Sequence, residues 1–247
     1  MIRFGEAFVL VHKQALLFAA AFPIVAAIAF LAELAQHGAE MAFGVYDEAV
    51  TARASGGDPR LAYAGFVEAV ALGIPAYWLV RWLHSGRSRL FARRLEKRAL
   101  GLFVLVLSLQ ILFHFLALFV WTNGPLSIGF FVFGLLFLPL ISRFVAAAPL
   151  GIFIAPRASM RVMVKDYPFA LSFSMLAPLP LLIARHALGL AAVHAPGTVA
   201  RWLILLIDSV VAAWLALIVI GVGYLIASRP LPLDMTVPRK SETGTNR

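Results

Sequence analysis

The sequence predicts an all-α membrane protein, a polytopic bundle of six transmembrane helices with both termini in the cytoplasm and short cytoplasmic amphipathic segments. Three observations lead to this fold class. The composition is 62% hydrophobic and only 13% charged, whereas soluble domains are about half apolar and about a quarter charged. The apolar residues gather in stretches of about 20 residues, the length that crosses about 30 Å of hydrocarbon. Lys and Arg collect between alternate stretches, as they do in cytoplasmic loops.

Each of the six apolar stretches is expected to form one membrane-spanning helix. They run over residues 14–35, 63–83, 99–121, 128–150, 169–190 and 201–226. The first is longer than the core of a cleaved signal peptide, which has about 7–15 residues, so we expect an uncleaved helix. Short connections at 122–127 and 191–200 predict that the third and fourth spans, and the fifth and sixth, are antiparallel neighbours. One six-helix domain would occupy residues 1–230, followed by a polar cytoplasmic tail, 231–247, expected to be disordered.

The distribution of positive charge predicts the orientation. All but four of the 21 Lys and Arg residues lie on the side that holds both termini, the exceptions being Arg53, Arg60, Arg185 and Arg201. The positive-inside rule places the basic side in the cytoplasm, and an even number of spans also requires both ends on one side. We therefore expect a multi-pass protein of a bacterial-type inner (plasma) membrane. The 36–62 connection would be the long exterior loop, with a turn at 56–59.

The basic segment 84–98 is the strongest local signal. Leu90, Phe91 and Leu95 recur at helical spacing among its cations. One interpretation is that the segment only orients the protein and extends the third span into the cytoplasm. The alternative is an amphipathic helix on the anionic inner leaflet, where each cation contributes about 1 kcal/mol. The candidate lipid-contacting residues are Arg89, Arg93, Arg94 and Lys97. A nucleic-acid partner is not expected, because cytoplasmic loops account for the net charge of +9.

Two further features lie near the predicted cytoplasmic side. The segment 156–168 mixes apolar and basic residues, which favours an interfacial helix, and Pro168 disfavours helix at the residue before it. Arg143 lies in the inner half of the fourth span, between Pro139 and Pro149. We expect its long side chain to extend to the cytoplasmic headgroups, with contact to a substrate as the alternative.

Four ionisable residues lie inside the apolar stretches, where burial in hydrocarbon is costly and function is the default hypothesis. They are Glu68, His114, Arg185 and Asp208. Counted along the predicted spans at 1.5 Å per residue, all four lie about 8–10 Å below the exterior boundary. Arg185 and Asp208 are expected to form an ion pair, and Gln110 shares a helix face with His114. This polar cluster would fix helix register, line an exterior-facing binding cavity, or form a proton or metal path.

No motif of known chemistry is present. The chain has no Cys, which excludes disulfides, thiolate catalysis and Cys-ligated metal clusters. Nucleotide-binding loops, the Gly-x-Ser-x-Gly elbow and the His-Glu-x-x-His helix are missing from the sequence. The polar cluster contains no closely spaced pair of ligands such as His-x-x-x-His, so no metal site and no cofactor are predicted.

Two short motifs carry a resemblance to a known family. Glu-Ala-Phe-Val-Leu-Val-His-Lys at 6–13 leads into the first span. Arg-Phe-Val-Ala-Ala-Ala-Pro at 143–149 precedes the basic segment 157–165. In these motifs and in its outline the chain resembles the bacterial six-helix inner-membrane proteins of the glycerophosphoryl diester phosphodiesterase membrane-domain-like group. The resemblance implies a membrane module without enzymatic activity, since the catalytic residues of the namesake enzymes lie in a separate domain.

The sequence therefore predicts a non-enzymatic integral inner-membrane protein that organises the membrane or serves as an accessory subunit. Its expected partners are the bilayer, anionic lipids at the cytoplasmic face and another membrane protein. The alternative is a small transporter or channel component with a polar site in the outer half of the bundle. An enzyme that acts on lipid within the membrane is disfavoured, because no nucleophile and base are paired.

Overall fold

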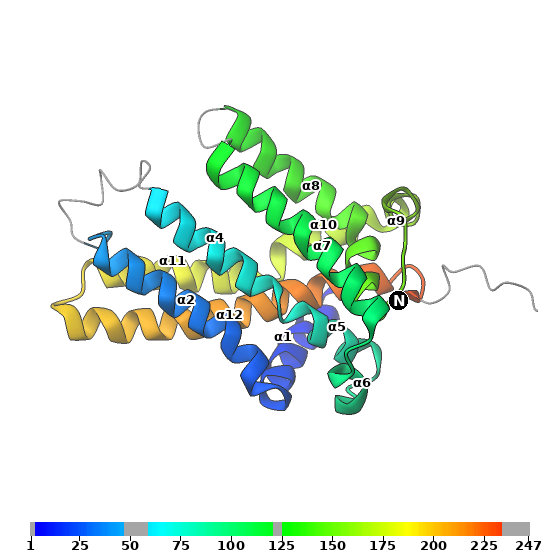
Figure 1. Cartoon of the computed structure of the whole chain (residues 1–247), viewed down its shortest axis with the longest axis horizontal. Helices are drawn as coiled ribbons and strands as arrows, with labels where there is room; N and C mark the ends of the chain where they lie inside the picture. Colours follow the sequence, from blue (N-terminus) through cyan, green and yellow to red (C-terminus); the bar gives the residue numbers. More distant parts are fainter. Residues whose placement is uncertain (1–2, 47–58, 121–124, 234–247) are drawn as a thin grey trace, which may run out of the picture.

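The computed structural model describes residues 3–46, 59–120 and 125–233 (Figure 1). Parts of three predicted features lie outside these ranges. They are the tail from residue 234, the turn at 56–59 up to Asp58, and the first residues of the connection 122–127, up to 124. The described chain is helical, without strands. Seven of its helical segments are long and apolar enough to cross a membrane: Phe4–Ala21, Pro23–Ala42, Pro59–His84, Lys97–Val120, Val132–Leu150, Pro156–Val193 and Thr198–Ser228. The described residues thus form a helical protein of membrane type.

The first apolar stretch forms two helices instead of the expected one. Helix α1 (Phe4–Ala21) ends before Phe22, and α2 (Pro23–Ala42) begins at Pro23. Proline has no N–H to donate, and its fixed φ suits the first turn of a helix, so the chain restarts there. Phe22 has a non-helical backbone (φ −132°, ψ 61°). The two helices diverge from this point (Figure 1).

Prolines also interrupt two later stretches. The expected second span consists of α4 (Pro59–Gly73) and α5 (Ala76–His84), separated at Pro75. The expected fifth span consists of α10 (Tyr167–Leu176) and α11 (Leu179–Val193), separated at Pro178. By contrast, α8 (Pro125–Ala147) contains Pro139 and continues through it.

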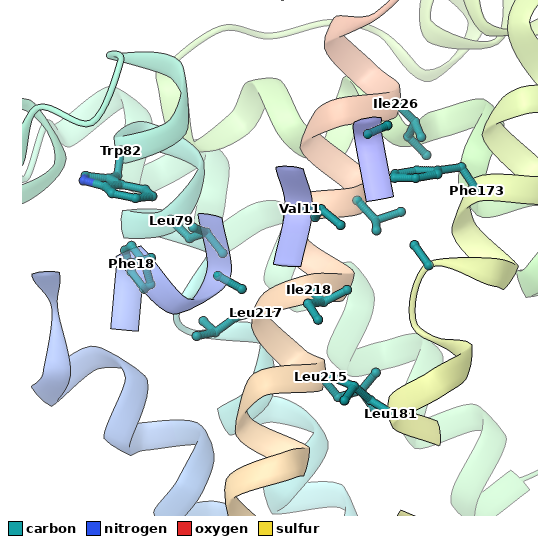
Figure 2. Packing of buried hydrophobic residues seen from close by; sticks show 14 of the residues in the cluster. Val11, Phe18, Leu79, Trp82, Phe173, Leu181, Leu215, Leu217, Ile218 and Ile226 are labelled. Atoms are coloured by element: carbon teal, nitrogen blue, oxygen red, sulfur yellow. The ribbon is translucent and has the colours of Figure 1, made fainter. Parts of the chain in front are cut away.

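The longest helix, α12 (Thr198–Ser228), lies at the centre of the molecule. It packs against α1, α2, α5, α8, α10 and α11. Figure 2 shows Val11 and Phe18 of α1 and Phe173 of α10 along the part of α12 that runs from Leu217 and Ile218 to Ile226, with Phe173 beside Ile226. The predicted antiparallel pairing of the fifth and sixth spans is confirmed for α11 and α12. Helix α7 (Lys97–Phe115), extended by a π-helical turn over Leu116–Val120, lies beside α8 in Figure 1.

Both described ends of the chain lie at the same end of α12. Phe4 at the start of α1 packs on Phe169 with ring centroids 6.0 Å apart. The Arg229 guanidinium, just after α12, lies 3.6 Å from the centroid of the same ring. At the other end of α12, the Trp202 ring lies near Gly38 of α2, 4.0 Å from the place that a Cβ of residue 38 would take. Helices α1 and α2 together therefore carry the chain once along the length of α12.

The basic segment 84–98 is not the single amphipathic helix of the alternative interpretation. Gly86 and Arg87 adopt left-handed backbone (φ 65° and 76°), and only α6 (Arg89–Arg93) is helical before α7 begins. A fully buried arginine, Arg81, fixes this shape. Its guanidinium donates to the backbone oxygens of Phe91 (3.2 Å) and Pro149 (3.0 Å), and it pairs with Glu96 (2.7 Å).

Arg143 does not extend toward lipid headgroups as expected; it is completely buried. Its guanidinium donates to the backbone oxygens of Ala227 (2.7 Å), Leu231 (2.5 Å) and Pro232 (3.2 Å). The last carbonyls of a helix have no partner within it, and a cation is favourable beside them. Arg143 therefore holds the end of α12.

The second basic segment follows a short 3-10 turn, Ala148–Leu150, and forms α9 (Pro156–Met163) with a further turn, Val164–Asp166. Helix α9 packs against α8. Its Ser159 hydroxyl accepts from the Arg143 backbone N–H (3.2 Å) and donates to the Leu140 backbone oxygen (2.8 Å). The helix expected in this segment is present. The prediction that Pro168 keeps the preceding residue out of a helix was wrong, because Tyr167 has helical angles (φ −57°, ψ −43°) and is the first residue of α10.

Candidate functional site

A polar cavity of about 460 Å³ lies among α2, α4, α11 and α12. It is lined mainly by polar side chains and by a few apolar residues of α11. The lining residues are Glu33, Gln36, His37, Glu40, Tyr46, Glu68, Arg185, His186, Gly189, Leu190, Val193 and Asp208. Large apolar clusters hold the rest of the bundle together, so this cavity concentrates ionisable groups at one place in the fold.

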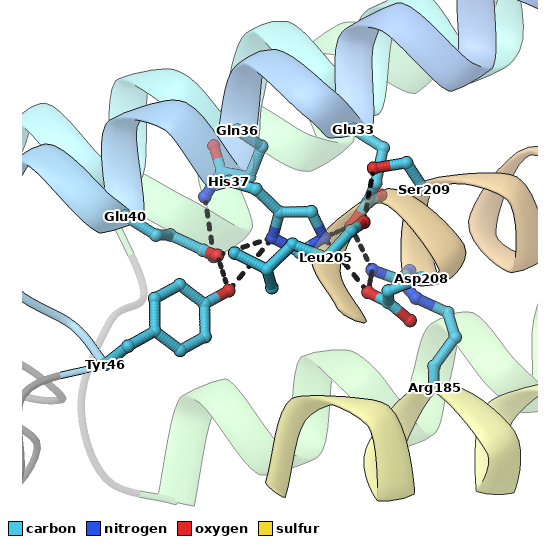
Figure 3. Close-up of polar contacts among 9 residues, drawn as sticks. All are labelled: Glu33, Gln36, His37, Glu40, Tyr46, Arg185, Leu205, Asp208 and Ser209. Atoms are coloured by element: carbon cyan, nitrogen blue, oxygen red, sulfur yellow. Dashed lines mark hydrogen bonds and ion pairs between the residues drawn. The ribbon is translucent and has the colours of Figure 1, made fainter. Parts of the chain in front are cut away.

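Helix α2 supplies most of the polar side chains. Glu33, Gln36, His37 and Glu40 follow one another at spacings of three and four residues, which places them on one helix face. Helix α2 continues to Ala42, so all four residues belong to it. Figure 3 shows that this face is turned toward α12. Glu33 and His37 are only 1% and 4% exposed.

His37 lies at the centre of the network. Its Nε2 is 3.1 Å from Asp208 Oδ2 and 3.4 Å from Glu33 Oε1. Its Nδ1 is 2.9 Å from Glu40 Oε2 and 2.9 Å from the Tyr46 hydroxyl. Nε2 therefore faces the carboxylates of Glu33 and Asp208 inside the bundle, and Nδ1 faces the carboxylate of Glu40 toward the end of α2.

Tyr46, in the turn after α2, fixes Glu40. Its hydroxyl donates a hydrogen bond to Glu40 Oε2, and Gln36 donates to the other carboxylate oxygen of Glu40 (3.2 Å). Burial and the neighbouring Glu40 carboxylate raise the pKa of Tyr46. The phenol thus keeps its proton and remains a donor over the physiological range.

Arg185 of α11 reaches the inner pair of carboxylates. Its Nη2 contacts Glu33 Oε1 and lies 3.4 Å from Asp208 Oδ2 (Figure 3). The predicted contact between Arg185 and Asp208 is confirmed. The Arg185 side chain is 28% exposed, whereas both carboxylates are buried. The guanidinium therefore sits at the boundary between the cavity and the buried carboxylates.

The structure brings together three of the four residues that depth along the spans predicted. Glu68 of α4 lines the same cavity as Arg185 and Asp208, but His114 does not. His114 Nδ1 is instead 2.8 Å from the Gln110 backbone oxygen of its own helix. Equal depth in the membrane says nothing of the direction in which a helix presents a side chain, and this is why the prediction fails for His114.

Sequence reasoning missed the polar face of α2. The stretch 14–35 was expected to be one span, so Glu33 fell at its end, and His37 and Glu40 fell in an exterior loop. The signal was present as Glu33-x-x-x-His37-x-x-Glu40, a spacing that places three ionisable groups on one helix face. Glu33 and His37 are also the closely spaced ligand pair that the prediction of no metal site overlooked.

The charges of the network do not balance. Four carboxylates, those of Glu33, Glu40, Glu68 and Asp208, line the cavity, together with one guanidinium and two imidazoles, those of His37 and His186. Two buried carboxylate oxygens, Glu33 Oε2 and Asp208 Oδ1, have no hydrogen-bond partner among the described residues. Buried carboxylates with unused acceptor capacity attract cations or protons.

The four candidate lipid-contacting cations, Arg89, Arg93, Arg94 and Lys97, are all exposed. They lie in and around α6, which Figure 1 shows on the opposite side of the molecule from the end of α2. Leu90 beside them is 82% exposed. An exposed apolar side chain among cations is typical of a segment at a membrane surface, and lipid contact here stays a prediction.

Comparison of the chain with protein family models, curated proteins and solved structures gives no match. The resemblance to the phosphodiesterase membrane-domain-like group stays a prediction. The class of the protein follows from the helices themselves, which are long and apolar enough to span a membrane and are compatible with a multi-pass membrane protein.

Proposed function

We propose that this chain is a multi-pass inner-membrane protein that binds a small cationic solute in its polar cavity, as a small transporter or channel component. The observation that carries the proposal is the cavity, which four carboxylates line together with one guanidinium and two imidazoles. Ionisable residues at membrane depth are rare, and they mark ion and substrate pathways when they line a hydrated cavity. No catalytic step is part of the proposal.

Charge segregation supports a cavity that faces away from the cytoplasm. Helices α6 and α9, which carry exposed cations, lie toward one end of the molecule in Figure 1, and the C-terminal half of α2, which carries the polar residues, lies toward the other. By the positive-inside rule, the basic end is cytoplasmic. Because α1 and α2 together carry the chain once along α12, six crossings with both termini in the cytoplasm remain the preferred topology.

The excess of carboxylates favours a cationic solute over an anionic one. An anion entering this cavity would meet four carboxylates. Among the residues that line it, Arg185 carries the one permanent positive charge. Like charges at close range in a site of low dielectric repel by several kcal/mol, by Coulomb's law. A cation instead finds acceptor oxygens that the protein leaves unused.

Water access to the cavity tests the proposal, and the lack of natural Cys makes the test direct. Gly189 lines the cavity, and a Cβ added there meets no atom within 4 Å. Gly189→Cys in membranes should therefore react with a membrane-impermeant thiol reagent applied from the side opposite the cytoplasm. Ile183→Cys, at a 61% exposed position of the same helix, is the matched control. It should stay unreactive, because a thiol in lipid remains protonated.

If Gly189→Cys is as unreactive as Ile183→Cys, the cavity is closed to water and the transporter proposal fails. The membrane-organising or accessory role predicted from the sequence requires no such access. That role would then be the one to pursue, by purification in mild detergent and measurement of a stoichiometric membrane-protein partner.

A further inference from the structure

We infer that Glu33, His37 and Asp208 form a binding site for a divalent transition-metal ion of the Zn²⁺ type, and that Arg185 is the tethered cation that neutralises the carboxylates when the metal is absent. The inference rests on the proposed function and names the class of its solute. Its three ligand atoms come from two helices, α2 and α12, and lie within 4.8 Å of one another.

The spacing of the ligand atoms fits a tetrahedral ion. Zn²⁺ binds imidazole nitrogen and carboxylate oxygen at about 2.0–2.2 Å, so adjacent tetrahedral ligands are about 3.3–3.6 Å apart. His37 Nε2 lies 3.4 Å from Glu33 Oε1 and 3.1 Å from Asp208 Oδ2. All three ligand atoms lie within 4.8 Å of one another, so the ion would draw the two carboxylates toward each other as it binds.

The surroundings of His37 match those of a metal-binding histidine. Such residues nearly always donate their second ring N–H to a carboxylate or carbonyl, which leaves the other nitrogen free to bind the metal. Nδ1 of His37 lies 2.9 Å from Glu40 Oε2. Glu40 is held in turn by Tyr46 and Gln36. Glu40 is thus a positioning residue that directs the Nε2 lone pair toward Glu33 and Asp208.

The unused oxygens provide an independent argument. Glu33 Oε2 and Asp208 Oδ1 belong to side chains that are 1% and 5% exposed, and neither atom has a partner among the described residues. An unpaired buried acceptor is costly, because it has lost its water without gaining a donor. A divalent ion would bind one oxygen of each carboxylate, or both, and would remove that cost.

Arg185 contacts the same two oxygens that the ion would use, Glu33 Oε1 and Asp208 Oδ2. Its side chain is partly exposed to the cavity and can withdraw as the ion enters. The donor set selects the ion: Ca²⁺ needs six to eight oxygens and Mg²⁺ keeps most of its water, whereas imidazole with carboxylates suits Zn²⁺ and its neighbours.

Metal titration of the purified full-length protein, prepared without a histidine tag, tests the inference. We expect one equivalent of Zn²⁺ per chain by calorimetry, and visible Co²⁺ absorption of a four-coordinate site. His37→Gln and Asp208→Asn should abolish both signals. Glu40→Gln should weaken binding about 10–100-fold, the usual effect of losing a carboxylate behind a metal-bound histidine. His114→Gln, a histidine outside the cavity, is the control and should bind as the natural chain does.

Arg185→Gln separates this inference from a misfolding artefact, because it predicts a gain. Removing the competing guanidinium should tighten Zn²⁺ binding by at least about tenfold, corresponding to about 1.4 kcal/mol. No binding of Zn²⁺ or Co²⁺ by the natural chain, binding that survives His37→Gln, or no gain with Arg185→Gln would each overturn it. If Gly189→Cys is labelled but the protein binds no metal, the metal site is rejected and the proposed function of the cavity is retained.

Discussion

Replacement of Arg143 by Met tests whether a buried cation, and not only apolar packing, secures the end of α12. Arg143 is completely buried, and its guanidinium donates to the backbone oxygens of Ala227, Leu231 and Pro232. Met retains the apolar stem and removes all three donors. The Ala227 carbonyl belongs to a residue that is itself buried, so water cannot replace the lost donor there.

The expected loss follows from the bond lengths. A hydrogen bond from a charged group contributes about 1.5–3 kcal/mol, and the two bonds to Ala227 and Leu231 are short, 2.7 and 2.5 Å. Leu231 is 44% exposed, so its carbonyl can regain water. The free energy of unfolding of Arg143→Met should therefore fall by about 3 kcal/mol, close to the value of one irreplaceable charged bond.

The measurement is unfolding in mixed micelles, followed by tryptophan fluorescence, with limited proteolysis of 229–233 as a local readout. Arg161→Met removes an exposed arginine of the neighbouring helix α9 and should change stability by less than about 0.5 kcal/mol. A variant Arg143→Met as stable as the natural chain, or more stable, would refute the reasoning. The desolvation of the buried guanidinium would then outweigh its bonds, as it does for some buried ion pairs.

Two further predictions concern packing and lipid. A Cβ at Gly221 would lie 2.8 Å from Val11 Cγ2, whereas one at Gly223 meets nothing within 4 Å; in the same unfolding assay Gly221→Ala should cost about 1–3 kcal/mol. Gly223→Ala is the control. Adding Val11→Ala to the Gly221→Ala variant should restore part of the lost stability. Equal losses of stability at both glycines would contradict the packing of α1 on α12. Replacing the four exposed cations near α6 by Gln should weaken binding of anionic lipid in mixed micelles by about 1 kcal/mol per cation, with binding of zwitterionic lipid as the control; unchanged anionic binding would refute the contact. The four residues are Arg89, Arg93, Arg94 and Lys97.

Hydropathy and charge sufficed to predict a helical protein of membrane type, because composition and stretch length respond to the solvent around a helix and not to its neighbours. They did not predict where proline breaks a helix. Pro139 lies inside α8, whereas Pro23 begins α2. Near Pro139, the hydroxyls of Tyr167 and Ser159 donate to the backbone oxygens of Leu136 and Leu140. These donors come from other helices, and the sequence of one stretch does not contain that information.

Charge counting had a second limit, since it treated every arginine as a surface group. Arg81 and Arg143 are completely buried and bind backbone carbonyls. Their contribution to the predicted orientation is therefore incidental to their role in the fold. The pairing of Arg185 with Asp208 was predictable because a short connection joins α11 to α12 and limits which faces can meet.

The break at Phe22 accounts for the position of the polar cavity. A single helix over 14–35 would leave His37 and Glu40 in a loop, free to turn toward water. With α2 running to Ala42, both stay on the face that also carries Glu33. Helix α1 then covers the apolar half of α12, where Gly221 faces Val11, and α2 covers the half that contains Asp208. The break at Pro23 thus allows α1 to cover the apolar half of α12 and α2 to place ionisable groups against its other half.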